Sequence, residues 1–302
     1  MNLSFRAPLL SDRSAVMSAA AMSGAVENDA AFANIYLLRE KYGIELAFYA
    51  KTVLRRYSCG FRKDAYGFPL GSSPLTETIP LLAEDAARRG LPLTLTLLNQ
   101  RQCEALRDAF PERFAFTGAE EYTEYIYLRE NLAELRGSRY HGKRNHIAQF
   151  WRAYPDARIQ PLIPENADLA LHVAEQWLAA RTDPLSPSLT AEMHAIREAC
   201  ENLAALGMSG LLLYAEGHPI GMTAVSEIAP RIFDVHFEKV VPGYSHAWPV
   251  VANEMAKCLR DADYLNREED LGEAGMRASK ASYRPDILNE KYIAVLRDGK
   301  EL

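Results

Sequence analysis

The sequence predicts an α/β (mixed α+β) fold made of two units, each with a mixed sheet flanked by helices. Two observations support this prediction. The chain has 302 residues and is 48% apolar, enough for one large domain or two of about 150 residues. Helical and strand-like hydrophobic patterns also alternate, and their order occurs twice. We therefore expect a first domain at 1–137, a linking helix at 138–155 and a second domain at 156–302.

The first half shows clear start and stop signals for its elements. Ser11 can cap a helix, Pro74 suits a first helical turn, and Leu93 to Leu98 is a continuous apolar run typical of a buried strand. The expected elements are a strand at 2–6, helices at 12–21 and 30–42, strands at 46–49, 53–56 and 66–70, a helix ending at 89, a strand at 93–98, a helix at 101–110 and a strand at 125–128. The strands at 46–49 and 53–56 are close enough in sequence to form a hairpin.

The second half follows the same order. We expect a strand at 158–162, helices at 165–180 and 192–206, antiparallel strands at 211–214, 220–226 and 232–240, a helix at 248–259, a strand at 264–265 and a helix from 273. This order resembles that of GNAT-type acyltransferases: strand, two helices, three strands, loop, helix, strand and helix. Two such units in tandem would place a cleft between them.

The expected linking helix carries two cations in an apolar position. At 100° per residue, Lys143 and Arg144 fall within the same sector as the aromatic residues of this helix. A buried cation is costly unless it is paired, so carboxylate partners or an anionic ligand are expected. The alternative is that both side chains extend along the surface to reach water.

Charge and hydropathy exclude several protein classes. Residues 1–155 carry 20 Lys and Arg against 17 Asp and Glu, and residues 156–302 carry 14 against 23. This balance argues against a protein that coats nucleic acid through bulk charge, although a local basic cleft is compatible with it. No stretch approaches the ~18 apolar residues of a membrane span, and no secretion signal is evident, so we expect a soluble cytoplasmic protein.

Cysteine and histidine spacing gives no metal-binding motif. The four cysteines lie far apart without a CxxC pair, and we expect them to be reduced, buried and inert. The seven histidines are scattered, and the run Glu268-Glu269-Asp270 cannot direct all its side chains to one ion, so no metal is expected. A nucleotide hydrolase is not expected either, because no GxxxxGK[ST] loop is present.

The expected strand at 232–240 lines up three ionisable residues. Period-two alternation places Asp234, His236 and Glu238 on one face. In a GNAT-like unit this is the fourth strand, which diverges from its neighbour and leaves backbone N–H groups free for a donor carbonyl. Acyl transfer to an amine also needs a base, for which His236 or Glu238 is our candidate. Alternatively, this is a half-exposed sheet face on which Glu238 forms an ordinary ion pair with Arg144, Arg267 or Arg277.

The loop that would hold coenzyme A lacks the usual pattern. Backbone N–H groups at a helix start bind phosphate, and ordinary acetyltransferases have Arg/Gln-x-x-Gly-x-Gly/Ala there. The corresponding stretch at 241–249 has one glycine with bulky neighbours, and Gly71 to Pro74 in the first half also departs from the pattern. This favours an aminoacyl ester on a transfer RNA over a pantetheine donor.

Several long motifs resemble one bacterial family. They are Lys143-Arg144-Asn145-His146-Ile147, His236-Phe237-Glu238-Lys239, the run from Asn266 to Gly272, Arg277, Lys280 and Ser282-Tyr283. That family is similar to the C-terminal catalytic region of phosphatidylglycerol lysyltransferase and, more distantly, to Fem-type aminoacyltransferases. The resemblance implies a tandem GNAT-like fold. It also implies aminoacyl transfer from aminoacyl-tRNA to an amine or hydroxyl on a small-molecule, peptide or lipid acceptor.

Under this interpretation the charged residues have expected roles. The cations would hold the phosphates of the terminal nucleotide of the donor: Lys143, Arg144, Arg267, Arg277 and Lys280. The acids Glu238, Glu268 and Asp270 would orient these cations or bind the α-amino group of the donor, and Tyr283 would donate to its carbonyl. The structural alternative for each is a buried ion-pair network.

Two other functions remain open from the sequence. One is an acyl-CoA-dependent N-acyltransferase, in which case coenzyme A is the donor; otherwise no cofactor is expected. The other is a non-catalytic ligand-binding protein with the same fold.

Overall fold

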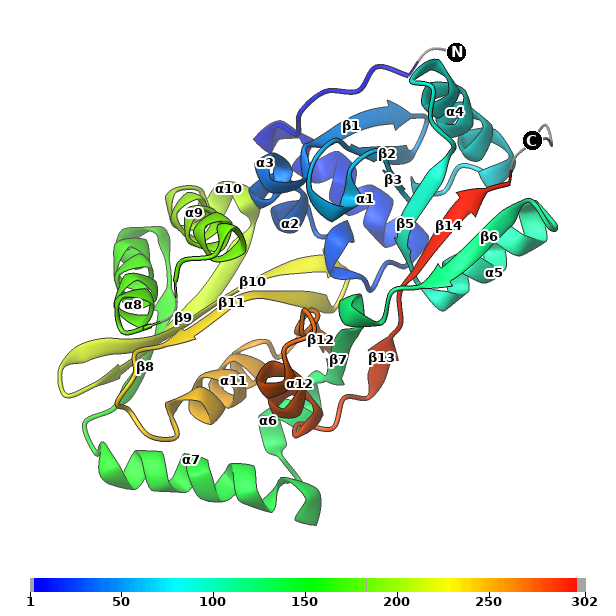
Figure 1. Ribbon diagram of the computed structural model, residues 1–302. Coiled ribbons are helices and arrows are strands. Elements are labelled where there is room, and N and C mark those ends of the chain that lie inside the picture. Colours follow the sequence, from blue (N-terminus) through cyan, green and yellow to red (C-terminus); the bar gives the residue numbers. More distant parts are fainter. Residues whose placement is uncertain (1–2, 183, 298–302) are drawn as a thin grey trace. The chain divides into compact units, whose positions relative to one another are not determined.

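A computed structural model describes residues 3–182 and 184–297 (Figure 1). The chain divides into two compact units, each discontinuous in sequence. Unit 1 contains the described parts of Met1–Tyr125, Glu269–Ala278 and Ile287–Leu302, and unit 2 contains Ile126–Glu268 and Ser279–Asp286. This division differs from the expected boundaries at 137 and 156, because C-terminal residues complete the sheet of unit 1. The expected domain limits stay a prediction.

The sheet of unit 1 combines antiparallel and parallel neighbours. Its strands are β1 (Ile44–Tyr49), β2 (Thr52–Tyr57), β3 (Tyr66–Gly67), β4 (Leu70–Gly71), β5 (Thr94–Leu98), β6 (Phe114–Gly118) and β14 (Tyr292–Leu296). The order is β1-β2-β3-β5-β14-β6, and β4 also pairs with β2. β1 and β2 form the expected antiparallel hairpin, whereas β3 and β5 are parallel.

Helices cover this sheet with their apolar sides. They are α1 (Arg13–Ser23), α2 (Phe32–Leu37), α3 (Arg39–Tyr42), α4 (Leu75–Arg88) and α5 (Gln100–Ala109). Ile79 and Leu82 of α4 and Leu106 of α5 are fully buried in one core with Leu95 of β5. Asn99 fixes the start of α5, because its side chain accepts a hydrogen bond from the Gln102 N–H at 2.9 Å.

The sheet of unit 2 has the strand pattern expected from the second half of the sequence. Its strands are the last part of β7 (Glu124–Leu128), β8 (Arg158–Leu162), β9 (Met208–Ala215), β10 (His218–Ala229), β11 (Ile232–Val240) and β12 (Tyr264–Asn266). β9, β10 and β11 are successive antiparallel neighbours, and β12 runs parallel to β11. The short strand β13 (Ile287–Asn289) belongs to unit 1.

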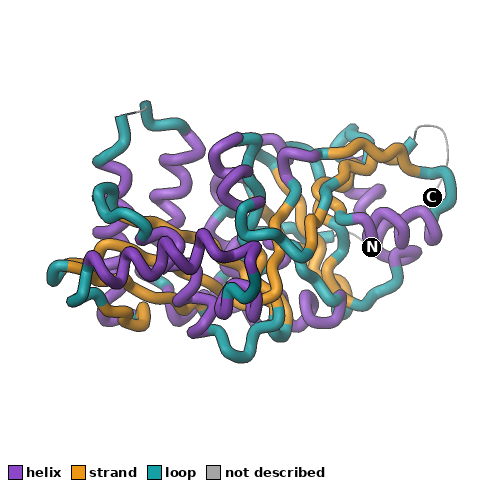
Figure 2. The backbone as a smooth tube through the Cα atoms, turned by 90° about the horizontal axis from the view of Figure 1, so that it is seen from below, coloured by secondary structure: helices purple, strands orange, loops and turns teal. Residues whose placement is uncertain are grey.

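Helices flank the strands of both sheets (Figure 2). The remaining helices are α6 (Arg129–Glu134), α7 (His141–Ala153), α8 (Ala167–Ala179), α9 (Pro187–Glu201), α10 (Leu203–Leu206), α11 (Ala247–Cys258) and α12 (Ala274–Ala281). Lys239 contacts Trp177 of α8 and Glu192 of α9, whereas the preceding Glu238 contacts Arg267. Successive residues of a strand point to opposite faces, so α8 and α9 cover the face of β11 that lies away from Arg267.

Several expected elements differ in detail. The linking helix begins as a 3-10 turn at Ser138–Tyr140 before α7, and the expected helix at 30–42 is two short helices. Residue 2 of the expected first strand lies outside the described residues, and Arg6 makes an isolated bridge to Leu46. β6, β13, β14 and α6 were not expected. Their short or weakly periodic sequences give little local signal.

Two further expectations concern cysteines and membrane segments. Cys103 is buried as expected, but Cys59 and Cys258 are exposed, so the prediction that all four are buried is wrong. Among the residues that the structure describes, no helix has both the length and the apolar character needed to cross a membrane.

Candidate functional site

In unit 2, β11 and β12 separate after a short parallel contact. Their paired residues are only Ile232 to Asp234 with Tyr264 to Asn266. Beyond Asp234, no strand of the described residues pairs with this edge of β11. Backbone N–H groups along the rest of the strand are therefore available to a ligand carbonyl, as a GNAT-like fourth strand requires.

A β-bulge lies in β11 beside this divergence. Ala224 of β10 pairs with Phe237 and Val225 with Val235, so His236 is the extra residue of the bulge. The His236 ring is held from both sides. Its Nε2 lies 2.7 Å from Ser226 Oγ, and its Nδ1 lies 3.3 Å from an Asp234 carboxylate oxygen. Burial lowers the pKa of His236 to about 3, so its imidazole is neutral at pH 7.

Glu238 and Arg267 form a nearly buried ion pair. One Arg267 nitrogen, Nη2, donates to both Glu238 oxygens at 3.0 Å, and the two side chains are only 12–14% exposed. Burial lowers the pKa of Arg267, but Glu238 and two tyrosines outweigh this effect and keep it above its ordinary value. The other terminal nitrogen, Nη1, is buried and has no hydrogen-bond partner among the described residues. This pair therefore leaves one donor of Arg267 unused.

Lys143 brings a second cation to the same place. Its ammonium nitrogen lies 3.8 Å from the centre of the Tyr283 ring, and the Arg267 guanidinium lies 5.0 Å from that centre. No carboxylate among the described residues pairs with Lys143. Burial, and secondarily the charge of Arg267, lowers the pKa of Lys143. Two cations thus share one ring, and of the two only Arg267 is paired with a carboxylate among the described residues, which favours binding of an anion.

Tyr283 and Lys280 complete this cluster. Burial raises the pKa of Tyr283 to about 12, so its hydroxyl stays protonated and can donate a hydrogen bond. Lys280 Nζ donates to the Arg267 carbonyl at 2.6 Å, and the Lys280 carbonyl accepts from Tyr127 at 2.8 Å. These contacts fix the backbone on both sides of the cluster. We call Lys143, Glu238, Arg267, Lys280 and Tyr283 the cationic cluster.

Arg144 does not join the cationic cluster. Its side chain is exposed and donates to the backbone carbonyls of Leu135 and of Gly137, the latter at 2.7 Å. Arg144 therefore holds the connection between α6 and α7. Asn253 has a similar role, since its amide donates to the carbonyls of Leu132 and Ala133.

Asp270 and Arg277 form a separate group in unit 1. Arg277 donates to both oxygens of Asp270 at 2.8 and 3.1 Å, and the Tyr125 hydroxyl donates at 2.6 Å. The hydrogen bonds from Arg277 lower the pKa of Asp270 to about 2, against the opposing effect of burial. The Arg277 side chain is 54% exposed. Of the expected run at 266–272, Glu268 lies in unit 2 near His236, whereas Asp270 lies in unit 1.

Sequence reasoning missed a buried charge network in unit 1. Lys291 pairs with Glu124 at 2.8 Å, with both side chains 1% exposed, and Asn289 donates to the same carboxylate at 2.7 Å. Asp29 lies 3.4 Å from Arg55. These residues are distant from one another in sequence. Such pairing of buried opposite charges is typical of a structural network.

The sequence analysis also missed Ser226 as a partner of His236. Ser226 ends the expected strand at 220–226, and it pairs directly with Asp234 across the β10–β11 hairpin. Antiparallel pairing of the two expected strands could have suggested this contact.

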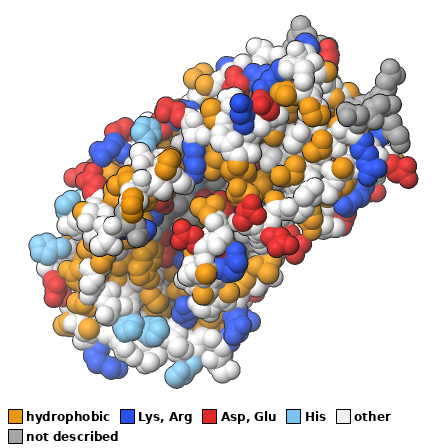
Figure 3. All heavy atoms as spheres, viewed as in Figure 1, with side chains coloured by type: hydrophobic (Ala, Val, Ile, Leu, Met, Phe, Trp, Pro, Cys, Tyr) orange, Lys and Arg blue, Asp and Glu red, His pale blue; other side chains and the backbone are white. Residues whose placement is uncertain are grey.

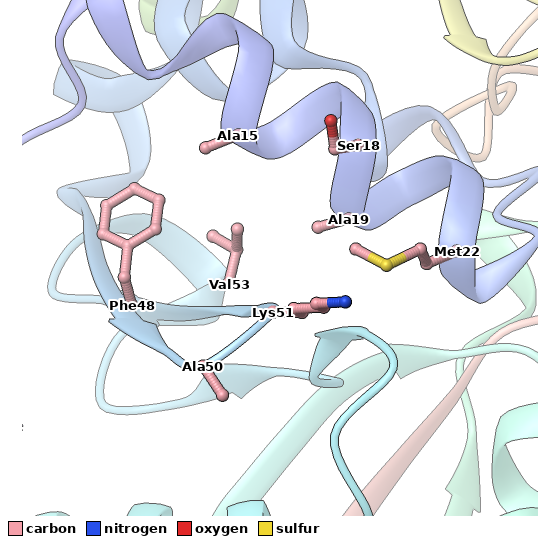
Figure 4. Close-up of a pocket in the computed structure, with 8 residues that line it drawn as sticks. All are labelled: Ala15, Ser18, Ala19, Met22, Phe48, Ala50, Lys51 and Val53. Atoms are coloured by element: carbon pink, nitrogen blue, oxygen red, sulfur yellow. The ribbon is translucent and has the colours of Figure 1, made fainter.

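A pocket of about 380 Å³ lies in unit 1 and is lined by none of the residues of the cationic cluster (Figure 4). Small residues of α1 and residues of the β1–β2 hairpin line it, among them Ala19, Met22, Phe48, Lys51 and Val53. No residue that we expected in the site lines this pocket. On the face shown in Figure 3, basic and acidic side chains are intermixed.

Comparison with solved structures supports the fold. A conserved protein of unknown function from Bacteroides thetaiotaomicron VPI-5482 is 31% identical, with a TM-score of 0.93, and the match covers 98% of this chain and 100% of that one. The C-terminal domain of a putative lysylphosphatidylglycerol synthetase from Agrobacterium fabrum is 13% identical, with a TM-score of 0.65 and coverage of 96% and 93%. FemX is 8% identical, with a TM-score of 0.62 and 98% coverage of both chains.

A tandem GNAT protein from the clavulanic acid biosynthesis pathway is 10% identical, with a TM-score of 0.50 and coverage of 99% and 100%. Together these likenesses confirm the predicted tandem GNAT-like fold with two mixed sheets flanked by helices. A search of curated proteins found no match. The family model described as "Phosphatidylglycerol lysyltransferase, C-terminal" matches residues 21–295. The chain therefore belongs to the family of phosphatidylglycerol lysyltransferase C-terminal domains.

Proposed function

We propose that this chain is an aminoacyltransferase that moves an aminoacyl group from aminoacyl-tRNA to an amine or hydroxyl of a lipid or peptide acceptor. Family and fold support an acyltransferase related to lysylphosphatidylglycerol synthase. The observation that supports the finer proposal is the cationic cluster, where Lys143 and Arg267 lie over the same Tyr283 ring and only Arg267 is paired with a carboxylate among the described residues. We place the activity in the cytoplasm, where charged tRNA is made.

The donor in this proposal is anionic and carries an ester carbonyl. Arg267 Nη1 and the Lys143 ammonium offer donors for which the described part of the chain shows no acceptor, which suits a phosphate of the terminal nucleotide. The ester carbonyl lies along the unpaired edge of β11. There backbone N–H groups and the protonated Tyr283 hydroxyl stabilise the oxyanion.

The transfer is a single displacement in this assignment. The acceptor oxygen or nitrogen attacks the ester carbonyl, the bond to the ribose oxygen breaks, and the acceptor proton passes through a base to that oxygen. Of our two candidate bases, Glu238 fits better, because both ring nitrogens of His236 already contact Ser226 and Asp234. Glu238 also orients Arg267.

The test offers the purified chain a choice of donors. Labelled aminoacyl-tRNAs and labelled acetyl-coenzyme A are incubated separately with phosphatidylglycerol vesicles, with peptide acceptors and with cell extract. We expect label to move from aminoacyl-tRNA into lipid or peptide. Transfer from the coenzyme A thioester alone would overturn the proposal in favour of an acyl-CoA-dependent enzyme. Tight tRNA binding without product from any acceptor would instead indicate a binding protein.

A matched pair of variants tests the role of the cluster. Arg267→Lys keeps the charge but removes the planar guanidinium, so we expect a large loss of transfer. Arg231→Lys is the control, because Arg231 also makes a two-point contact with a carboxylate, at 2.7 and 2.6 Å to Asp263, on the surface of the same unit. Equal activity of the two variants would contradict the assignment of Arg267.

A further inference from the structure

Three residues with metal-binding side chains meet where β11 and β12 separate. Asp234 and His236 lie on β11, and Glu268 follows β12 by two residues. One ligand atom from each lies within 4.8 Å of the other two. No metal site was expected from the sequence, because its histidines are scattered and the contiguous run Glu268-Glu269-Asp270 cannot direct all its side chains to one ion.

The spacing of the three atoms suits a divalent ion. Bonds of about 2.0 to 2.2 Å from nitrogen and oxygen ligands place neighbouring ligand atoms about 3 to 3.5 Å apart. His236 Nδ1 and the Asp234 oxygen are already 3.3 Å apart. Glu268 is only partly buried, so its longer side chain can close the remaining distance by rotation.

The second ring nitrogen of His236 has the kind of partner that metal-bound histidines have. A ligating imidazole commonly donates its other N–H to a neighbouring oxygen, which fixes the ring orientation. Here Nε2 lies 2.7 Å from Ser226 Oγ, and Ser226 is 3% exposed. The ring is thereby held with Nδ1 directed at the carboxylate of Asp234.

The same contacts also resemble a Ser–His–Asp relay, in which Ser226 would be a nucleophile. A nucleophile must reach the substrate, and the burial of Ser226 within the β10–β11 hairpin opposes this role. Glu268 would also have no part in a relay. The metal alternative uses all three acidic and imidazole groups and gives Ser226 a positioning role.

We propose that Asp234, His236 and Glu268 bind one divalent transition-metal ion such as Zn²⁺ or Mn²⁺. The ion ties the segment after β12 to β11 at the point where the two strands diverge. Arg267 lies in this segment next to Glu268, so the bound ion also fixes the backbone of a residue of the cationic cluster. A fourth position open to water is typical of ions with three protein ligands.

The test measures metal binding by the full chain and needs no enzymatic activity. The protein is stripped with a chelator, and Zn²⁺ binding is measured by calorimetry and by elemental analysis after dialysis. We expect one equivalent to bind to the wild type. Asp234→Asn, His236→Gln and Glu268→Gln should each remove this binding, and Ser226→Ala should weaken it about tenfold.

His146→Gln is the matched control. His146 and His246 stack with their ring centres 4.5 Å apart, and His146 is exposed, so this pair is the obvious place for adventitious zinc. Unchanged binding in His146→Gln with loss in His236→Gln supports the proposal. Loss in His146→Gln, equal binding in all variants, or no binding to the wild type overturns it.

Two further readouts cover the case in which a buried variant does not fold. Circular dichroism of each metal-free variant shows whether its fold is intact. Co²⁺ bound to the wild type should give visible absorption bands of a low-symmetry nitrogen–oxygen site. The proposal is supported if these bands persist in His146→Gln and weaken in Ser226→Ala. Bands that are lost in His146→Gln and unchanged in Ser226→Ala contradict it. Because aminoacyl transfer is not measured, failure here is distinguishable from failure of the proposed function.

Discussion

Glu238→Gln should destabilise unit 2 far more than a comparable surface change. The substitution keeps the shape of the side chain but removes the carboxylate that pairs with Arg267. Removal of one partner from a buried ion pair typically costs about 3–5 kcal/mol. Since both side chains retain 12–14% exposure, we expect the lower end, about 3 kcal/mol. Lys143 contributes additional repulsion, because it shares the Tyr283 ring with Arg267.

Tryptophan fluorescence makes this measurement specific to unit 2. All three tryptophans of the chain, Trp151, Trp177 and Trp248, belong to this unit. Urea unfolding followed by their emission therefore gives the free energy of unfolding for unit 2. Asp263→Asn is the control, since it breaks a solvent-exposed surface pair with Arg231 and should have little effect.

A second substitution separates charge from packing. Lys143→Met in the Glu238→Gln background should recover part of the lost stability, because it removes a like charge near Arg267. If Glu238→Gln costs no more than Asp263→Asn, the Glu238–Arg267 pair is not an important buried contact. If Lys143→Met gives no recovery, Lys143 and Arg267 do not interact as we describe.

Three more predictions concern the framework. Hydrogen bonding to Arg6 lowers the pKa of Asp12, so Asp12→Asn should destabilise unit 1 at pH 7. The difference in stability between this variant and the wild type should vanish as the pH falls below the lowered pKa. Thermal unfolding measured at a series of pH values checks this. Gly210→Ala should destabilise unit 2 by about 1–3 kcal/mol, because a Cβ there would lie 2.0 Å from a backbone carbonyl oxygen of β10. Gly142→Ala in α7 is the control: its Cβ meets nothing within 4 Å, and the change should stabilise the helix by about 0.5–1 kcal/mol. Similar urea midpoints for the two variants would contradict this prediction. Burial raises the pKa of Cys103 to about 11, so its thiol should react with iodoacetamide only after unfolding. The exposed cysteines should react at neutral pH in the folded protein, and mass spectrometry of peptides measures both reactions.

Much of the fold follows from local sequence patterns. The expected strands at 158–162 and 232–240 have the same bounds as β8 and β11, and most expected helices differ by one or two residues at each end. Period-two alternation and turn residues are local signals, so they can be identified without knowledge of the fold. The order of elements then indicated two GNAT-like units, which the solved structures confirm.

Long-range pairing could not be predicted in the same way. β14 lies between β5 and β6, almost 200 residues away in sequence, and nothing in its five residues indicates this partner. The division into units therefore follows contacts that local patterns do not encode. The same reason explains why Lys291 and Glu124 were not expected as a buried pair.

The candidate site was predictable in its residue types and only partly in its geometry. Lys143, Glu238, Arg267 and Tyr283 came from motifs and do meet in unit 2. Arg144 has the same charge and nearly the same position on the helix as Lys143, yet it faces backbone carbonyls outside the cluster. A shift of 100° along a helix decides this difference, and a helical projection is too coarse to resolve it.

The central claim is that Lys143 and Arg267 bind the anionic end of an aminoacylated donor. The most direct measurement is the affinity of a labelled RNA hairpin with an amide-linked aminoacyl group at its terminal adenosine, measured by fluorescence anisotropy at fixed salt. We predict that Lys143→Met and Arg267→Lys each weaken binding about tenfold or more, while Arg231→Lys binds like the wild type. Equal affinity of all four proteins for this hairpin would contradict the claim.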